Sequence, residues 1–370
     1  MRYTRAEINL PALKFNLEGI RKRVGKDVKI MGLVKSNAYG HGLREISGAL
    51  VEFGIDFLGV SIVEEGIKLR QQGIKCPIII LGGVPLHQVT NFLEYDLDMA
   101  VSSVELAHTI NDLTAGSRIK PKIHINIDSG MGRLGTRPET APLFIEQAMM
   151  MKNLRLVGVY SHFATSDERD KTYAYEQLHR FSTVVNFLKS KGIELPYIHI
   201  ANSGAVLDMP ESYFTMVRPG MIMFGLYPSR ETSESIALKP VLSLKSNIIF
   251  IKNVSAGTAI GYHRTHLTKR ETRIATIPIG YGDGYSYRLS NHSEVLIHEH
   301  RHPIVGTVTM DQIMVDVGPD ATFRVGDEVV LIGSQGKESI PAQELASKLG
   351  TITYEIFTGI TSRVPRIITT

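Results

Sequence analysis

The sequence has very little cysteine: Cys76 is the only one among 370 residues. One cysteine cannot form an internal disulfide, and such scarcity is typical of proteins in a reducing compartment. Cys76 precedes the apolar run at 77–81, which predicts a buried core thiol. The opening segment MRYTRAEINL lacks the apolar centre of a signal peptide, and no apolar run approaches the roughly eighteen residues of a membrane span. These absences predict a cytoplasmic protein that does not enter a membrane.

The sequence also lacks a strong excess of charge of one sign. Its 41 basic and 37 acidic residues give a formal net charge of +4, and they form no block of about five or six like charges. This balance argues against a basic tail for nucleic acid and suits small anionic ligands. Hydrophobic residues make up 43% and charged residues 21%, which is ordinary for a globular protein, and the length favours two domains.

Short apolar runs recur through the first two thirds of the chain and predict strands. They occupy residues 29–35, 57–62, 77–83, 98–103, 122–128, 156–163, 197–203 and 214–221. Segments with helical spacing of apolar residues lie between them, such as 44–54, 64–73 and 175–192. Strands that alternate with helices indicate a parallel sheet covered on both faces. The pattern predicts a (β/α)8 TIM-type barrel, with an open doubly wound sheet as the structural alternative.

The pattern changes after about residue 235, where strand-like segments separated by turns predict a mostly β domain. The segments are SLKSNIIFIKNV, RIATIPIGYGDGY, SEVLIHEH, HPIVGTVT, QIMVDV and DEVVLIG, and one helix is predicted at 341–350. We therefore expect an α/β + β protein with a barrel domain at 1–232 and a β-rich domain at 233–370. The opening strand RAEINL fits either domain, so it is also a candidate for pairing with the C-terminal domain.

Chemically useful side chains follow several of the predicted barrel strands. In such barrels catalytic residues lie where strands end and the next loops begin. Those positions hold Lys35, Arg133, His162, Ser203 and Arg218. Each has a structural alternative, because a single charge is usually solvated and a single histidine can be a satisfied core residue. Together they supply an amine nucleophile, two cations and neutral hydrogen-bond donors.

The ends of the seventh and eighth strands are a recurrent phosphate site in barrels. There, Ser203 would open a helix and offer its hydroxyl and backbone N–H groups, and Gly220 would let the backbone approach a ligand closely. A lysine combined with a phosphate cradle suggests a Schiff base between Lys35 and pyridoxal phosphate.

Two further patterns are weaker. Residues 130–135 match GxGxxG, but the match follows the fifth strand and the next strand ends without an acid, so we treat it as chance. His298, His300 and His302 alternate and could share a strand face for a metal ion. We favour an exposed hairpin tip, because only Glu299 accompanies them, and we expect no metal site.

The segment VKSNAYGHG at 34–42 closely resembles the cofactor attachment motif of pyridoxal-phosphate-dependent alanine racemases. The resemblance continues in order along nearly the whole chain. It includes residues 128–135, 160–165, 199–203, 217–220, 261–262, 277–285, 310–312, 354–355 and 363–366. The fold that it implies, a barrel followed by a β domain, agrees with the strand pattern.

The resemblance implies two catalytic bases and a cofactor site. Lys35 would hold pyridoxal 5'-phosphate as a Schiff base and act as one base. Tyr262 of the partner subunit would be the opposite base, so the resemblance also implies a homodimer with shared active sites. Arg218 would face the pyridine nitrogen, with His162 beside the ring. The residues that would hold the phosphate are Tyr39, Ser203, Gly220, Met221 and Tyr354.

The same resemblance implies how the substrate is held. Arg133 would support the phenolic oxygen of the cofactor and the carboxylate of alanine, and the Met310 backbone would also meet the substrate. Asn126, Asp311 and Tyr281 would support the site. The implied reaction interconverts L-alanine and D-alanine by proton transfer at Cα and supplies D-alanine for peptidoglycan.

One departure from the common pattern concerns Asn126. Many members have there a carboxylated lysine, whose negative charge orients the arginine that corresponds to Arg133. Asn126 is neutral, so we expect either that Asp128 pairs with Arg133 or that a chloride ion lies near Asn126 and Arg133. We favour chloride, because Asp128 precedes Ser129-Gly130 and is expected to be engaged in the turn. Thr307 and Tyr287 also replace arginines that are frequent in the family.

Three other functions are compatible with part of the pattern. A pyridoxal-phosphate homeostasis protein would resemble the barrel alone, so residues 235–370 count against it. A barrel-type decarboxylase would carry a catalytic cysteine in its C-terminal domain, and none is present there. Serine racemases of the membrane-anchored kind carry an additional transmembrane region, and broad-spectrum racemases are typically exported.

Overall fold

The computed structural model describes residues 2–320 and 322–369. The chain forms two compact units. The first, which we call the barrel unit, contains residues Pro11–Ala38 and Leu43–Lys239. The second, the β unit, contains Met1–Leu10, Tyr39–Gly42 and Pro240–Thr370.

The barrel unit contains an eight-stranded parallel sheet in the order β8-β7-β6-β5-β4-β3-β2-β9. The strands are β2 (Lys29–Leu33), β3 (Phe57–Val60), β4 (Ile78–Ile80), β5 (Asp98–Val101), β6 (Lys122–Asn126), β7 (Arg155–Tyr160), β8 (Tyr197–His199) and β9 (Met216–Val217). The first and last strands of this order are joined by backbone hydrogen bonds from Thr215 N to Ile198 O (3.2 Å) and from Arg218 N to Ala201 O (2.8 Å). The sheet therefore closes, which confirms the predicted barrel and excludes the open sheet.

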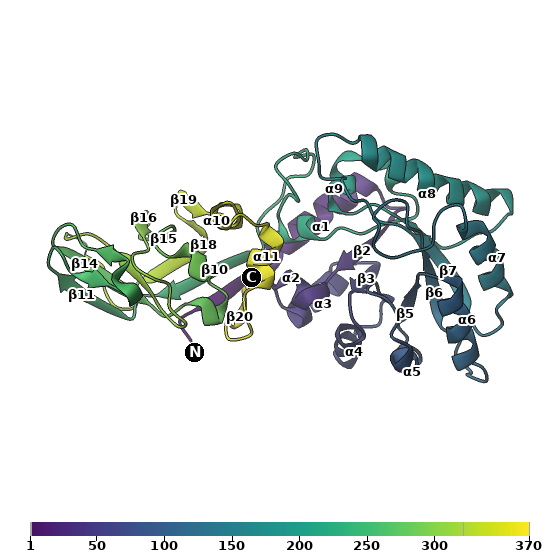
Figure 1. The fold of residues 1–370 in the computed structure, drawn as a ribbon, viewed down its shortest axis with the longest axis horizontal. Coiled ribbons are helices and arrows are strands. Elements are labelled where there is room, and N and C mark those ends of the chain that lie inside the picture. The colour runs from purple at the N-terminus through teal and green to yellow at the C-terminus, as the bar shows by residue number, and fades with distance from the viewer. Residues whose placement is uncertain (1, 321, 370) are drawn as a thin grey trace. The chain divides into compact units, whose positions relative to one another are not determined.

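Helices cover the outside of this sheet, as Figure 1 shows for α3 to α8. They are α1 (Leu10–Val24), α3 (Leu43–Glu52), α4 (Val63–Gln71), α5 (Val89–Glu94), α6 (Val104–Leu113), α7 (Ala141–Met150), α8 (Thr172–Ser190) and α9 (Ser203–Asp208). The strands are buried on both faces, which explains their continuous apolar sequences. Short 3-10 helices lie at η1 (Leu86–Gln88), η2 (Pro210–Ser212) and η3 (Met221–Phe224). None of the helices that the structure describes is long and apolar enough to cross a membrane.

The β unit is built around a seven-stranded sheet with the order β16-β15-β18-β10-β1-β20, in which β19 pairs with β18. Its strands are β1 (Arg5–Asn9), β10 (Leu242–Asn247), β15 (Glu294–Ile297), β16 (His300–Pro303), β18 (Glu328–Gln335), β19 (Glu338–Ile340) and β20 (Arg366–Thr369). The opening strand β1 thus pairs with β10 on one side and with β20 on the other.

Smaller elements complete the β unit. A three-stranded sheet contains β11 (Phe250–Val254), β14 (Thr272–Ile277) and β17 (Ile313–Asp316), and β12 (Ala259–Ile260) pairs with β13 (His266–Leu267). The helices are α10 (Ala342–Leu349) and α11 (Thr353–Thr358), with 3-10 turns η4 (Tyr262–Arg264), η5 (Tyr281–Asp283) and η6 (Tyr287–Leu289). The helix predicted at 341–350 is confirmed as α10.

Three sequence-based expectations were wrong in detail. The segment SLKSNIIFIKNV forms two strands, β10 and β11, which belong to different sheets. In HPIVGTVT only the first residues continue a strand, which ends at Pro303. Cys76 is partly exposed and not a core thiol, because the buried strand β4 begins only at Ile78. The hairpin tip is confirmed: His298 and Glu299 have positive φ angles between the paired strands β15 and β16.

Candidate functional site

Lys35 lies two residues after the end of β2 and lines a cavity of about 270 Å³ in the barrel unit. Four other predicted residues line the same cavity: Asn126, Arg133, His162 and Arg218. They come from β6, from the loops after β6 and β7, and from the loop after β9. The structure therefore brings the amine and both predicted cations together at one cavity.

Lys35 lies in surroundings that favour its neutral form. Burial lowers the pKa of this amine, and the positive charge of Arg133 lowers it further. The Glu65 carboxylate acts in the opposite direction, and Arg218 adds a smaller lowering effect. Burial is thus a larger cause of the lowered pKa than the nearby positive charge. A neutral amine is the form that acts as a nucleophile or a base.

The backbone after Lys35 has an unusual left-handed conformation. The φ angles of Ser36, Asn37, Ala38 and Tyr39 are 53°, 56°, 52° and 52°. Residues other than glycine adopt such angles at a cost of order 1–3 kcal/mol each, so neighbouring groups must hold this turn.

Glu65 on α4 holds the turn from the side of the barrel unit. Its carboxylate accepts hydrogen bonds from the backbone N–H groups of Ser36 (2.5 Å), Asn37 (3.4 Å) and, through the other oxygen, Ser61 (3.1 Å). The Asn37 side chain in turn accepts from the N–H of Leu43 at 2.8 Å. Glu65 was missed in the sequence, because an acid in the first turn of a helix is common for helix stability alone.

Replacing Glu65 should disturb the turn that carries Lys35. Glu65→Ala is expected to lower the free energy of unfolding by about 2–3 kcal/mol, since hydrogen bonds to charged groups contribute about 1.5–3 kcal/mol. It should also weaken cofactor binding, because the turn follows Lys35 directly. Urea unfolding and titration with pyridoxal phosphate measure the two effects.

Glu64→Ala is the matched control for this experiment. Glu64 is the preceding residue, is exposed, and accepts a hydrogen bond from the Gln88 side chain at 2.7 Å. Equal stability and equal cofactor affinity in the Glu64→Ala and Glu65→Ala proteins would contradict the assigned role.

Arg218 is almost completely buried, with 2% of its surface exposed. Its Nη1 donates to His199 Nδ1 (2.6 Å) and to the His199 carbonyl (3.0 Å). Its Nη2 donates to the carbonyls of Ser161 (2.6 Å) and Ile200 (3.2 Å), and contacts His162 Nδ1 at 3.1 Å. Burial lowers the pKa of Arg218 to about 10, so the side chain remains a cation at neutral pH.

His162 lies beside this cation and is held neutral. Burial, followed by the charges of Arg218, Arg133 and Lys35, places the pKa of His162 well below its ordinary value. A neutral imidazole can accept the Arg218 hydrogen bond at Nδ1. His162 is therefore a hydrogen-bonding wall of the cavity and not a second buried cation.

The predicted phosphate residues of the barrel unit lie close together. Ser203 is the first residue of α9, as expected, and its Oγ accepts a hydrogen bond from Gly220 N at 2.9 Å. Met221 begins the 3-10 helix η3 and is buried. The two loops thus present a serine hydroxyl and neighbouring backbone at the end of the barrel that carries Lys35.

Arg133 lines the cavity, but its side chain is exposed in the single chain. In the part of the chain that the structure describes, no ion pair joins it to Asp128. Asp128 Oδ1 instead accepts from the N–H groups of Gly130 and Gly132, each at 3.0 Å, which confirms that it is engaged in the turn. Asn126 Nδ2 donates to the Leu134 carbonyl at 3.1 Å.

The predicted tyrosines belong to the β unit. The rings of Tyr39 and Tyr354 lie 6.0 Å apart. Tyr262 opens the turn η4, and 67% of its surface is exposed. Its backbone is fixed, because Thr307 Oγ1 donates to the Tyr262 carbonyl at 2.9 Å. Gly261 has a φ of 74°, and a Cβ there would lie 3.1 Å from Thr307 N, so glycine is required before this tyrosine.

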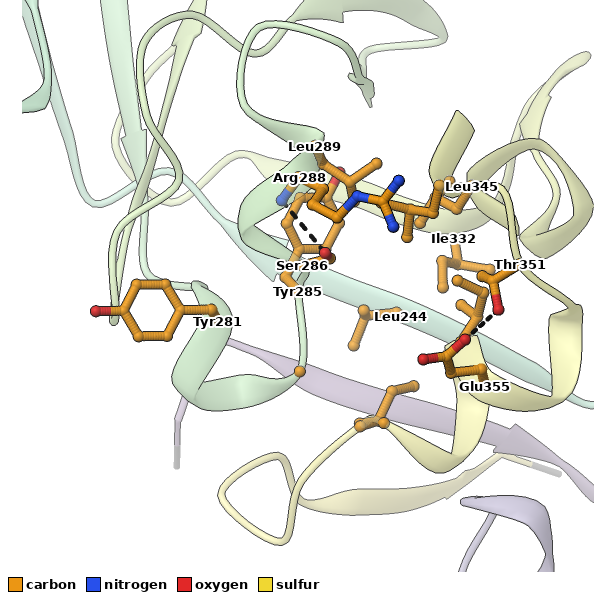
Figure 2. Close-up of a pocket in the computed structure, with 15 residues that line it drawn as sticks. Leu244, Tyr281, Tyr285, Ser286, Arg288, Leu289, Ile332, Leu345, Thr351 and Glu355 are labelled. Carbon is orange, nitrogen blue, oxygen red and sulfur yellow. Dashed lines mark hydrogen bonds between the residues drawn. The ribbon is translucent and has the colours of Figure 1, made fainter. Parts of the chain in front are cut away.

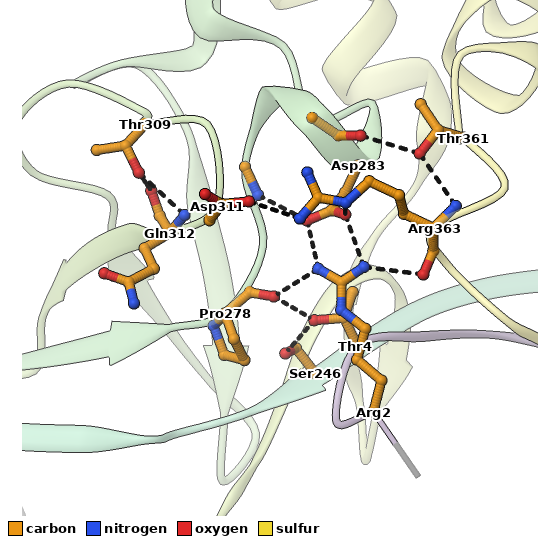
Figure 3. A network of polar contacts seen from close by, with 12 residues as sticks. Arg2, Thr4, Ser246, Pro278, Asp283, Thr309, Asp311, Gln312, Thr361 and Arg363 are labelled. Atoms are coloured by element: carbon orange, nitrogen blue, oxygen red, sulfur yellow. Dashed lines mark hydrogen bonds and ion pairs between the residues drawn. The ribbon is translucent and has the colours of Figure 1, made fainter.

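A polar network holds the loop with Met310 and Asp311 (Figure 3). Arg363 Nη2 donates to Asp311 Oδ1 at 2.5 Å, and the Met310 carbonyl accepts from Gly282 N at 2.9 Å. The buried Asp283 binds both terminal nitrogens of Arg2, at 2.7 and 2.6 Å. Arg2 was missed in the sequence, because nothing near the N-terminus signals a partner so distant along the chain.

The backbone of Tyr281 is fixed by the same loop, since its N–H donates to the Thr309 carbonyl at 3.0 Å. Tyr281 also lines a second cavity, of about 280 Å³, inside the β unit (Figure 2). Aliphatic side chains such as Leu244, Ile332 and Leu345 gather there, and the Tyr281 ring points away from them. This cavity holds no amine or imidazole, so the barrel cavity is the better candidate for chemistry.

No group of three or more histidine, cysteine or acidic side chains in the described residues could hold a metal ion.

Comparison with known proteins gives a consistent result. Residues 8–228 match the family model "Alanine racemase, N-terminal domain", and residues 241–368 match "Alanine racemase, C-terminal domain". The alanine racemase of Halothermothrix orenii is 45% identical over 365 residues, which cover 99% of this chain and 96% of the relative.

Solved structures agree over the whole length. The alanine racemase of Clostridium difficile 630 is similar with a TM-score of 0.95 and 38% identity, covering 100% of this chain and 96% of that one. That of Bacillus anthracis with bound L-Ala-P has a TM-score of 0.94 and 40% identity, with the same coverage of both chains. The protein described here belongs to the alanine racemase family.

Proposed function

We propose that this protein interconverts L-alanine and D-alanine with pyridoxal 5'-phosphate as its cofactor. The observation that carries the proposal is Lys35, a half-buried amine with a lowered pKa that shares one cavity with two arginines. Family membership supports the same reaction. We further propose that the protein acts in the cytoplasm and that its D-alanine supplies peptidoglycan synthesis.

The side chains around the cavity suit pyridoxal phosphate. Lys35 offers an amine for a Schiff base, and Arg218 offers a buried guanidinium that keeps its proton at neutral pH. Ser203 and the Gly220 N–H, already hydrogen-bonded to each other, offer a hydroxyl and backbone for the phosphate. When bound, this cofactor supplies an electron sink for the electron pair left at Cα of an amino acid that loses its proton.

Racemisation requires that a proton leave one face of Cα and return on the other, so two bases are needed. We propose Lys35 as one base, because its burial favours the neutral amine. We propose Tyr262 as the other. Its exposed ring and fixed backbone suit a side chain that completes an active site in a second copy of the chain. The proposal therefore includes a homodimer with shared sites.

The remaining roles concern binding. Arg218 would donate a hydrogen bond to the pyridine nitrogen and, as a cation that does not release its proton readily, would leave that nitrogen unprotonated. His162 would line the ring as a neutral imidazole. Arg133 would bind the alanine carboxylate, because it is a cation at the same cavity.

The β unit supplies the other binding groups in this proposal. Tyr39 and Tyr354 would donate to the phosphate through their hydroxyls. Met221 of the barrel unit would also hold the phosphate. The Met310 backbone would meet the substrate, and Asp311 and Tyr281 would support it through the loop shown in Figure 3.

We also propose that a chloride ion occupies the space between Asn126 and Arg133. An amide nitrogen carries two hydrogens, so the bond from Asn126 to Leu134 uses only one of them. Asp128 is engaged by two backbone N–H groups, so an anion other than Asp128 would orient Arg133. The support for this ion is the neutral Asn126, which lines the same cavity as the exposed Arg133.

Racemase activity is expected to depend on chloride and to be indifferent to bicarbonate. Replacing chloride with gluconate at constant ionic strength should lower the rate severalfold, because Arg133 loses the anion that orients it. Asn126→Asp supplies a fixed negative charge and should abolish the chloride dependence. An unchanged rate of the unmodified protein in gluconate would contradict the proposal.

The proposed reaction is tested by incubating purified protein and cofactor with L-alanine and following its optical rotation. Rotation should fall to zero and stay there, because the equilibrium mixture of enantiomers is equal. The same end point should be reached from D-alanine. Transfer of the amino group, release of carbon dioxide or no change would overturn the proposed function.

A further inference from the structure

Four polar side chains form an unbroken chain through the interior of the barrel. Asp98 on β5, His124 on β6 and His199 on β8 are at most 1% exposed, and Arg218 after β9 is 2% exposed. Asp98 Oδ2 lies 3.2 Å from His124 Nε2, His124 Nδ1 lies 3.4 Å from His199 Nε2, and His199 Nδ1 lies 2.6 Å from Arg218 Nη1. The reaction proposed above uses only the Arg218 end.

The direction of these hydrogen bonds follows from the chemistry of the two end groups. A guanidinium can only donate, so in this arrangement His199 Nδ1 accepts and carries no hydrogen. Neutral His199 then carries its hydrogen on Nε2 and donates it to His124 Nδ1. His124 in turn carries its hydrogen on Nε2 and donates it to the Asp98 carboxylate, which can only accept.

Stacked aromatic rings hold the planes of the two imidazoles. The Tyr160 ring stacks on His199 with centroids 5.1 Å apart and an interplanar angle of 7°. The Tyr197 ring stacks on His124 at 5.4 Å and 16°. Stacking thus holds the plane of each imidazole, the contacts at Nδ1 and Nε2 set which edge faces each partner, and the position of each hydrogen remains to be selected.

Asp98 is suited to make that selection. Lys122 Nζ lies 3.6 Å from Asp98 Oδ1, so a cation faces this carboxyl group on the side away from His124. Arg218 favours the same hydrogen positions from the other end, but without an acceptor at position 98 the Nε2–H of His124 would be buried with no partner. The form of His124 with its hydrogen on Nδ1, which faces His199 Nε2 with a donor, would then compete. His199 would then carry its own hydrogen on Nδ1, directly against the donors of Arg218.

We propose that Asp98 is a positioning residue that acts through His124 and His199, fixing His199 Nδ1 as the acceptor that orients the Arg218 guanidinium. The side chain that meets the pyridine nitrogen is thereby anchored to a carboxylate three hydrogen bonds away. The hydrogen positions follow from the geometry alone, whereas their effect on racemisation rests on the proposed function.

Imidazole nitrogen NMR tests the hydrogen positions directly. In protein labelled with ¹⁵N-histidine, two-bond ¹H–¹⁵N correlations distinguish the two neutral forms of each ring. His124 and His199 should both carry the hydrogen on Nε2, and their signals are identified by their loss in His124→Gln and His199→Gln proteins. A hydrogen on Nδ1 of His199 in the unmodified protein would overturn the proposal.

Asp98→Ala should shift His124 and His199 toward a mixture of the two forms. Asp98→Asn, which keeps the volume of the side chain, serves if the alanine variant fails to fold. The asparagine amide can donate as well as accept, so it should also weaken the selection. Asp96→Ala is the control, because Asp96 binds the same Lys122 at 2.8 Å but does not contact His124 through any bond of the described residues.

The same variants test the effect on the reaction. Both Asp98 variants should lower kcat by about tenfold or more, the scale expected when a hydrogen bond to a charged group is lost, and should shift the visible spectrum of the bound cofactor. Asp96→Ala should change neither. If the Asp98 variants alter the hydrogen positions but the unmodified protein does not racemise alanine, the proposed function is refuted. The proposed chain of hydrogen bonds is then still supported. Unaltered positions in the Asp98 variants would refute the proposed role of Asp98.

Discussion

Borohydride reduction of the protein loaded with pyridoxal phosphate is expected to attach the cofactor to Lys35 alone. The Lys35 amine is half-buried, and its lowered pKa favours the neutral form that attacks a carbonyl. Lys35→Ala should lower racemisation by a factor on the order of 10⁴–10⁶, the range found when a covalent catalytic group is removed. Peptide mapping locates the label, and the assay with L-alanine measures the loss.

The control for this experiment is Lys29→Ala. Lys29 is at the start of β2, the same strand that Lys35 follows, and it is exposed. This variant should keep both the label at Lys35 and nearly full activity. A reduced cofactor on any lysine other than Lys35 would show that the cavity in the barrel has been misassigned.

Tyr262→Phe is expected to abolish racemisation but to preserve proton exchange at Cα of one alanine enantiomer. The phenylalanine ring keeps the shape of the side chain but has no hydroxyl to carry a proton, so the base on one face of Cα is lost. The variant should still exchange the α-proton of one alanine enantiomer with solvent, through Lys35, and should fail with the other. Proton NMR of each enantiomer in deuterium oxide measures both rates.

A mixed dimer tests whether Tyr262 acts in a second copy of the chain. Lys35→Ala and Tyr262→Phe chains should each be inactive, yet their heterodimer should regain activity, because one of its two sites contains both bases. Tyr175→Phe, which alters an exposed tyrosine of the barrel unit, serves as a control and should leave activity unchanged. Verified heterodimers without activity would place both bases in one chain.

The barrel could be predicted because its strands have a strong local signal. Runs such as Ile78–Ile80 and Phe57–Val60 are buried on both faces and are therefore apolar without interruption. Lys35 and Arg218 belong to two other predicted runs, at 29–35 and 214–221, and their positions near the strand ends predicted them as neighbours. Backbone topology alone places such residues at one end of a barrel, so no knowledge of their side-chain contacts was needed.

The β unit was predicted less well, because short strands change sheets without a sequence signal. The chain leaves β10 at Asn247 and enters β11 at Phe250, and the two residues between them are both isoleucine. In the sequence, an apolar link of this kind cannot be distinguished from a continuation of the strand. The partner of each strand depends on contacts with distant segments, such as β1 with β10 and β20.

The supporting residues of the site could not be predicted for a related reason. Glu65 resembles an ordinary acid at the start of a helix. Its role depends on the left-handed turn at 36–39, which contains no glycine that would have indicated positive φ angles in the sequence. Asp98 opens a strand as a charged residue, which is common at strand ends. Their importance appears only when the barrel closes and brings Ser36 to Glu65 and His124 to Asp98.

Proton transfer by two bases on opposite faces of Cα is tested most directly by the first turnovers in deuterium oxide. L-alanine with hydrogen at Cα is mixed with the protein and its cofactor, and the D-alanine formed early is analysed by mass spectrometry. With two bases, nearly all of that D-alanine should carry deuterium, because the proton returned to Cα comes from a different group than the one that removed it. D-alanine that keeps the original hydrogen would show that a single base carries the proton across, and would contradict the assignment of Lys35 and Tyr262 to opposite faces.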